Sequence, residues 1–240
     1  LTLPDGFTAI TVAENLGRIR HIAVNTNGDI YAKLERLKDG KGILLLKNGD
    51  AARVSGFGNY PGTGIAVKDG YLYASSNSAV YRYKLKPDNE VEDPAHPERI
   101  IKDLTDRGQH NAKSITLDDE GNIYVNIGAP SNSCQEQDRA VGSKGQNPCP
   151  ILDYAGGIWQ FKADQPDQTL QNGVHYATGI RNAVGISWNS SVNELYAMQH
   201  GRDDLHRMFG NLYTAKENAE LPAEEFWMVK KGADVGWAYW

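Results

Sequence analysis

The sequence predicts an all-β protein, a β-propeller of four-stranded blades. Two observations favour this fold. Helical periodicity is almost absent from the 240 residues, and short apolar runs are separated by Gly, Asn and Asp. In addition, one hairpin pattern occurs four times: an apolar strand, a turn containing Gly or Asn, and a second strand that ends in Tyr and a small residue. The copies start roughly 40 to 70 residues apart, as expected for propeller blades that carry variable loops.

The hairpins supply two strands of each blade, and other apolar runs supply the rest. The hairpins are expected at residues 22–32, 65–74, 115–125 and 186–197. Further strands are expected at residues 42–46, 80–85 and 157–161. The tyrosines that end the hairpins are Tyr31, Tyr73, Tyr124 and Tyr196. Because they recur at one blade position, we expect them to be packing residues and not to form an aromatic cage.

Residues 1–240 are expected to form a single propeller domain that carries the catalytic site and contains about four blades. The final run, GADVGWAYW, follows a strand-like segment, and no further strand is left to close the ring. An open propeller would leave strand edges unpaired and an apolar face exposed. We therefore expect the propeller to be truncated at its C-terminal end.

Charge and hydropathy limit the classes of partner. The formal net charge is −5 and both signs are interspersed, so the sequence does not suggest a nucleic-acid-binding surface. There is no apolar run of transmembrane length, and no charged-then-apolar signal segment at Leu1. We expect a mature or trimmed product or a cytoplasmic protein, whose partner is a small molecule or another protein.

The two cysteines give information about the cellular compartment in which the protein works. Cys134 and Cys149 flank a loop rich in Gly, Gln and charged residues, without the four-ligand spacing of a structural zinc site. A disulfide would stabilise such a loop by roughly 3 kcal/mol. The alternative is two separate free thiols. If the disulfide forms, the compartment is oxidising, which means the periplasm or the outside of the cell.

Polar residues precede the inner strands of the third and fourth hairpins at equivalent positions. His110 precedes the third, and Arg181 and Asn182 precede the fourth, so all three should converge on one face of the propeller. A histidine there could take a proton from a bound alcohol. The alternative is a loop histidine bonded to backbone. Arg181 would offer a positive charge to an oxyanion or carboxylate, or it would form a salt bridge between blades.

A third polar cluster, His200-Gly201-Arg202-Asp203-Asp204, follows the last predicted hairpin. Backbone carbonyls in a Gly-containing turn, beside two carboxylates, suit a hard cation such as calcium. The alternative is a turn whose acidic residues are simply solvated.

Four segments together resemble the sorbosone and glucose dehydrogenase family. They are HNAKSITLDDEGNIYVNIGAPSNSC, YATGIRNAVGISW, MQHGRDDL and PAEEFWMVKKGADVGWAY, in the family's order, and the resemblance runs from about Pro4 to Tyr239. Members are six-bladed propellers that use pyrroloquinoline quinone (PQQ) and calcium. The resemblance implies a periplasmic or secreted enzyme that oxidises an aldose, a sorbosone-like sugar or another pyranose. Electrons would pass to a cytochrome or another acceptor, although the chain contains no C-x-x-C-H haem motif.

The resemblance also assigns roles to single residues. His110 matches the family's general base, which acts on the sugar hydroxyl while hydride passes to the quinone. Arg181 matches the arginine of the G-x-R-N motif, which contacts the quinone oxygens and stabilises negative charge. Asn182 matches its neighbour at the cofactor edge, and His200 falls on a cofactor-contacting position.

Gly201 and Arg202 fall where the family uses two consecutive backbone carbonyls as calcium ligands. Three departures accompany this match. Arg202 stands where many relatives have Pro, and the terminal GWAYW differs from the family's usual run. The Lys, Arg and Thr contacts to the cofactor that later blades supply in the family have no counterpart in this sequence.

Two other functions remain open. A metal-dependent sugar lactonase on a similar propeller would need side-chain carboxylates and Asn on the channel in place of the His110 and Arg181 pair. A non-catalytic propeller that binds peptide or glycan would have no affinity for the cofactor.

Overall fold

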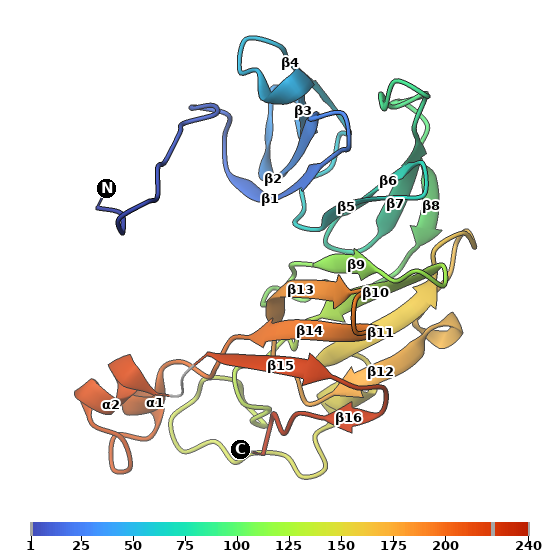
Figure 1. Ribbon diagram of the computed structural model, residues 1–240. Coiled ribbons are helices and arrows are strands. Elements are labelled where there is room, and N and C mark those ends of the chain that lie inside the picture. Colours follow the sequence, from blue (N-terminus) through green and yellow to red (C-terminus); the bar gives the residue numbers. More distant parts are fainter. Residues whose placement is uncertain (1, 222–223, 240) are drawn as a thin grey trace.

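The computed structural model describes residues 2–221 and 224–239, and the strands of these residues form the blades of an open propeller (Figure 1). The first blade has the order β1-β2-β3-β4 and the second β5-β6-β7-β8. Their strands are β1 (Ile19–Val24), β2 (Ile30–Lys38), β3 (Lys41–Leu46), β4 (Val54–Phe57), β5 (Ile65–Lys68), β6 (Tyr71–Ser75), β7 (Val80–Lys84) and β8 (Glu98–Ile101).

The third and fourth blades depart from the uniform four-strand prediction. Their strands are β9 (Ile115–Leu117), β10 (Asn122–Ile127), β11 (Gly157–Lys162), β12 (Val174–Thr178), β13 (Ala183–Asn189), β14 (Glu194–Gln199), β15 (Glu225–Val229) and β16 (Ala233–Asp234). Among the described residues the fourth blade has three strands, β13-β14-β15. The chain then returns to the third blade, where β16 pairs in parallel with β12. Two short helices, α1 (Leu205–Met208) and α2 (Ala215–Glu220), interrupt the β14–β15 connection.

The sequence-predicted strands are confirmed, and their antiparallel order determines which loops share an end of the propeller. The innermost strands β1, β5, β9 and β13 lie next to one another in turn. Because strand direction alternates within a blade, the loop that enters each innermost strand lies at the same end as the connection between the second and third strands. This end carries His110, Arg181 and His200.

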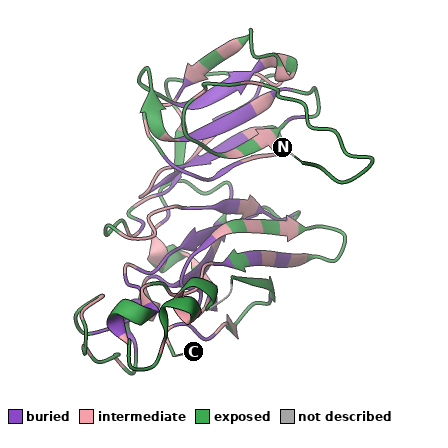
Figure 2. Cartoon of the chain, turned by 90° about the vertical axis from the view of Figure 1, so that its left-hand side faces the viewer, coloured by how far each residue is buried: buried purple, intermediate pink, exposed green. Residues whose placement is uncertain are grey.

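The core lies between blades. Tyr31 packs between the first and second blades, Tyr73 between the second and third, and Tyr124 between the third and fourth. All three are buried, which confirms the packing prediction. Figure 2 shows that the buried segments lie mostly along the strands of the blades. Tyr196 is half-buried and stacks on Phe226, because no further blade covers its face among the described residues.

Two lysines are fully buried, one within β2 and one just before β9. Lys33 donates from Nζ to the carbonyls of Tyr60 at 2.7 Å and Gly42 at 3.2 Å. Lys113 donates to the Asn111 carbonyl at 2.8 Å, beneath the loop that carries His110. Loss of hydration lowers the pKa of Lys33 to about 7 and that of Lys113 to about 8.

Because the pKa values of these lysines are lowered in the folded protein, we expect the protein to become more stable as the pH rises from 8 to 9.5. In that interval the unfolded chain keeps the proton on Lys33 that the folded chain has mostly released. The free energy of unfolding should therefore increase by roughly 1 kcal/mol per pH unit from this residue. Urea unfolding at several pH values measures the slope. Lys33→Met should lower the slope, and an unchanged slope in this variant would contradict the prediction.

Candidate functional site

His110 is held with one ring nitrogen free. Its backbone lies in the left-handed region, with φ of 50°, and Nδ1 is 2.5 Å from the Ala129 carbonyl oxygen. A carbonyl only accepts, so Nδ1 carries the ring proton and Nε2 is the unprotonated nitrogen. No described residue hydrogen-bonds to Nε2. Burial, more than any charge, lowers the pKa of His110, so the ring is a neutral base at neutral pH.

Gly128 brings His110 and Asn182 together. A Cβ atom on Gly128 would lie 2.6 Å from Asn182 Oδ1 and 2.6 Å from His110 Cβ, closer than side chains can approach. Asn182 is fixed on both sides: its Oδ1 accepts from Asn126 Nδ2 at 3.0 Å, and its backbone oxygen accepts from His200 N at 2.9 Å. The predicted convergence of His110 and Asn182 therefore depends on the absence of a side chain at Gly128.

Arg181 lies in the same loop as Asn182, with only 3% of its surface exposed. Its Nε donates to the Asn132 carbonyl at 3.1 Å, and its Nη2 donates to Asn132 Oδ1 at 2.8 Å. A longer contact of 3.3 Å joins Nη2 to Asp203 Oδ2. Burial lowers the pKa of Arg181, but an arginine remains charged in proteins, so the site holds a fixed positive charge.

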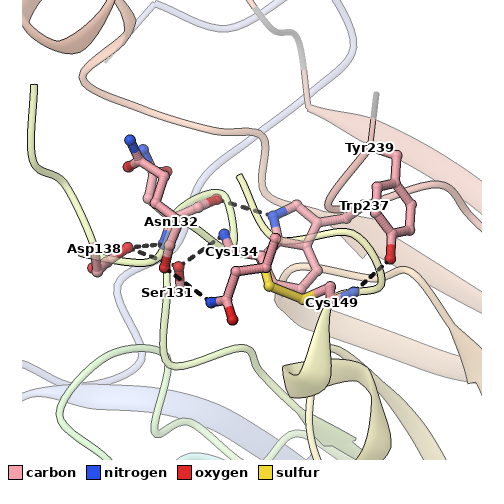
Figure 3. Close-up of a disulfide and its surroundings, with 9 residues drawn as sticks. Ser131, Asn132, Cys134, Asp138, Cys149, Trp237 and Tyr239 are labelled. Atoms are coloured by element: carbon pink, nitrogen blue, oxygen red, sulfur yellow. Dashed lines mark hydrogen bonds between the residues drawn. A yellow bond between two sulfur atoms is a disulfide. The ribbon is translucent and has the colours of Figure 1, made fainter. Parts of the chain in front are cut away.

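Asn132 is the residue that joins the parts of this site, and it did not stand out in the sequence. Besides the two bonds from Arg181, its Oδ1 accepts from Asp203 N at 3.1 Å and its Nδ2 donates to the Asp203 carbonyl at 2.7 Å. Its own carbonyl also accepts from Trp237 Nε1 at 2.9 Å (Figure 3). The only local signal is its position two residues before Cys134 in an irregular loop. Asn132 thus positions both the Arg181 guanidinium and the turn that begins at His200.

In the turn that begins at His200, the side chain of His200 is already paired. His200 pairs through Nδ1 with Glu224 at 3.2 Å, and its N–H ties it to the Asn182 loop. Gly201 and Arg202 have irregular backbone and are half-buried. Arg202 Nε is buried, and no described residue accepts a hydrogen bond from it.

The acidic residues of the turn are already paired with arginines. Arg139 forms an ion pair with Asp203, and it contacts Asp204 at 3.0 Å. Arg207 also contacts Asp204, at 2.8 Å. No group of three or more His, Cys, Asp or Glu side chains with metal-binding spacing occurs among the described residues. Both carboxylates of the turn thus lie against arginine side chains.

Cys134 and Cys149 form a disulfide, which confirms the predicted pairing (Figure 3). It closes the loop that carries Asn132. Cys134 N donates to Ser131 Oγ at 2.9 Å, and Asp138 Oδ1 accepts from Ser131 Oγ at 2.7 Å and from Asn132 N at 2.9 Å. Burial raises the pKa of the Asp138 carboxyl, but the hydrogen bonds that its carboxylate accepts outweigh this effect and hold the pKa below its usual range.

We expect the protein to lose stability when the disulfide is removed. In the variant that carries both Cys134→Ser and Cys149→Ser, the free energy of unfolding should fall by about 3 kcal/mol, since the unfolded chain gains the freedom of the opened loop. Urea unfolding measures the change. Ser133→Ala in the same loop is the control that keeps the cross-link. Equal stability of the double variant and this control would contradict the prediction.

Comparison with known proteins identifies the family. The TrAA12-like family model matches residues 1–238. The chain belongs to the TrAA12-like family. This TrAA12-like chain is 24% identical over 226 residues to the pyrroloquinoline quinone-dependent sugar dehydrogenase of Hypocrea jecorina (strain QM6a), a match that covers 90% of the chain and 51% of the relative. The predicted family resemblance is therefore confirmed.

Solved structures confirm the propeller fold of the TrAA12-like chain. The holo form of the pyranose dehydrogenase PQQ domain from Coprinopsis cinerea superposes with a TM-score of 0.67 at 18% identity, over 90% of this chain and 52% of that one. The PQQ-bound aldose sugar dehydrogenase from Streptomyces coelicolor superposes with a TM-score of 0.61 at 20% identity, over 95% of this chain and 64% of that one. The TrAA12-like chain spans about half the length of the first two relatives. Within its described residues, no helix has the length and apolar character needed to cross a membrane.

Proposed function

We propose that the TrAA12-like chain carries the catalytic face of a PQQ-dependent sugar dehydrogenase, which uses calcium and oxidises an aldose, a sorbosone-like sugar or another pyranose. The observation that carries this proposal is the His110 ring. Its Nδ1 is committed to a carbonyl and its Nε2 is free, beside the buried charge of Arg181. The names of the relatives and their folds support the same activity.

The polar atoms of the site fit an oxygen-rich, anionic ring such as PQQ. Arg181 offers fixed positive charge, and Arg202 Nε is a buried donor without a partner in the described chain. The absence of a side chain at Gly128 lets His110 and Asn182 lie close together, so that both can face one ligand. We assign the cofactor contacts to His110, Arg181, Asn182 and His200.

Calcium would be held by the backbone carbonyls of Gly201 and Arg202, since hard cations prefer oxygen ligands. The adjacent carboxylates of Asp203 and Asp204 are paired with arginines, and Asn132 fixes the backbone of Asp203 on both sides. This arrangement favours carbonyl ligands over carboxylate ligands at the turn.

The reaction removes a hydride from the sugar carbon and a proton from its hydroxyl. His110 Nε2 accepts that proton, and the Ala129 carbonyl stabilises the resulting imidazolium through Nδ1–H. When bound, the quinone would accept the hydride, and calcium would polarise the quinone. Arg181 holds positive charge where negative charge develops.

We infer further that the protein works in an oxidising compartment, the periplasm or outside the cell, because the Cys134–Cys149 disulfide needs one to persist. A cytochrome or another acceptor would then take the electrons from the reduced protein.

Titration of the calcium-loaded protein with PQQ, followed by cofactor absorbance, tests the proposal. Binding should saturate and weaken when calcium is chelated. Arg181→Gln should weaken binding at least about tenfold, since it removes a buried charge-assisted contact. Arg53→Gln, an exposed position on the β3–β4 turn at the opposite end of the first blade, should leave it unchanged. Absence of binding by folded protein would contradict the proposal and favour a lactonase or a non-catalytic propeller.

A further inference from the structure

A cavity of about 300 Å³ lies beside the loop of His110, on the side of the first two blades. Gly108 and Asn111, which flank His110 in sequence, line it together with Arg20, Arg36 and Thr63. Its volume is at the lower end of the range of small-molecule sites, roughly 300–1,000 Å³. The cavity is therefore large enough for a compact ligand and adjoins the proposed catalytic base.

Two separate strand irregularities supply the arginines of this cavity. The β1–β2 register passes from Ile19↔Leu34 to His21↔Lys33, so Arg20 is an extra residue without a partner on β2. The β2–β3 register passes from Lys33↔Ile43 to Lys38↔Lys41, so residues 34–37, which include Arg36, bulge out opposite Gly42. Bulges turn side chains away from the regular alternation and are frequent next to binding sites.

The cavity carries more positive charge than its own carboxylate can balance. Glu35 is the acidic residue in its lining, and its Oε2 already pairs with Arg18 Nε at 3.0 Å. Within the described residues, no carboxylate lies in ion-pair distance of Arg20 or Arg36. The chain as a whole has a net charge of −5, so this concentration of guanidinium groups is local. Such a cavity attracts an anion.

Asn111, one of the residues that line the cavity, has a side-chain oxygen that lacks a hydrogen-bond donor within the described chain. Asn111 Oδ1 is buried and has no partner among the described residues. An unsatisfied buried acceptor is costly, and a ligand hydroxyl would satisfy it. The side chains around the cavity therefore suit a small molecule that carries both a carboxylate and hydroxyl groups.

We propose that this cavity is a carboxylate subsite for acidic sugars, with Arg20 and Arg36 binding the carboxylate of a hexuronic acid and Asn111 accepting from one of its hydroxyls. The inference rests on the proposed function for turnover, and it narrows the substrate class. Binding of the acid itself depends only on the cavity. The sugar would lie next to the loop of His110, and for turnover its reacting hydroxyl would extend from the cavity to His110 Nε2.

Calorimetric titration of the full chain with D-glucuronate and D-glucose at low ionic strength tests the subsite. Glucuronate should bind at least about tenfold more tightly than glucose, and added salt should weaken its binding. Arg20→Gln and Arg36→Gln should each remove most of this preference and leave glucose binding unchanged. Both arginines are exposed, so the variants should fold. Arg53→Gln on the same blade is the matched control.

Equal affinity of the unaltered protein for the two sugars would overturn the subsite. So would Arg20→Gln and Arg36→Gln variants that bind PQQ more weakly but retain the preference for glucuronate, since the arginines would then serve the cofactor. Glucuronate binding that needs both arginines, in a protein that fails to bind PQQ, would uphold the subsite and refute the proposed dehydrogenase.

Discussion

His110→Asn is expected to lower kcat by about 10²–10⁴-fold, because it removes the general base. Asn is the informative replacement, since it tolerates the left-handed backbone conformation of this position, with φ of 50°, better than Ala does. The affinity for PQQ should change much less than kcat, because Arg181 and the turn at residues 201–202 remain. Steady-state kinetics and cofactor titration on the same preparations measure both quantities.

The pH profile separates a base from a structural histidine. Burial lowers the pKa of His110, so the midpoint of the acidic decline in kcat/KM of the unaltered protein should lie below the ordinary histidine pKa. This acidic decline should be absent from the residual activity of His110→Asn. The exposed His96→Asn variant should keep both rate and profile. A His110→Asn protein with the rate of the unaltered protein would show that another residue takes the proton.

Asn132→Leu is expected to destabilise the protein by about 3 kcal/mol or more and to weaken PQQ binding. The change leaves Arg181 Nη2 without its 2.8 Å partner and both backbone groups of Asp203 unbonded. Removing the partner of a buried charge is among the costliest single changes. Urea unfolding and cofactor titration measure the two effects.

A double-mutant cycle shows whether Asn132 acts through Arg181. If it does, combining Asn132→Leu with Arg181→Gln should weaken PQQ binding by less than the sum of the two single changes, when each is expressed as a free energy. Additive losses would mean that Asn132 supports the site by another route, such as the Asp203 turn. An Asn132→Leu protein with unchanged cofactor affinity would contradict its positioning role.

The strands were predictable because their signals are local. The turn before Asp29 and the alternation around Tyr31 are contained within a few residues, and the same pattern recurs in the next three blades. Equivalent loop positions likewise indicated that His110 and Asn182 meet, since a propeller repeats its geometry. The bonds that hold Tyr124 in the core also form within its own hairpin and the adjacent strand.

The connections within the site were not predictable from the sequence. Asn132 lies 49 residues from Arg181 and 105 from Trp237, and the path of a long irregular loop decides whether they meet. The pairing of Asp203 with Arg139 depends on the same loop. The sequence did not predict that Arg20 and Arg36 share a cavity, because a β-bulge leaves no recognisable pattern in the residues around it.

The most direct test of the account is anaerobic mixing of calcium- and PQQ-loaded protein with aldoses, sorbosone and hexuronates, while the cofactor spectrum is recorded. The account predicts that at least one of these sugars reduces the cofactor, and that His110→Asn slows this step by about 10²-fold or more without loss of bound cofactor. Loaded protein whose spectrum does not change with any of these sugars, or whose His110→Asn variant is reduced at the rate of the unaltered protein, would contradict it.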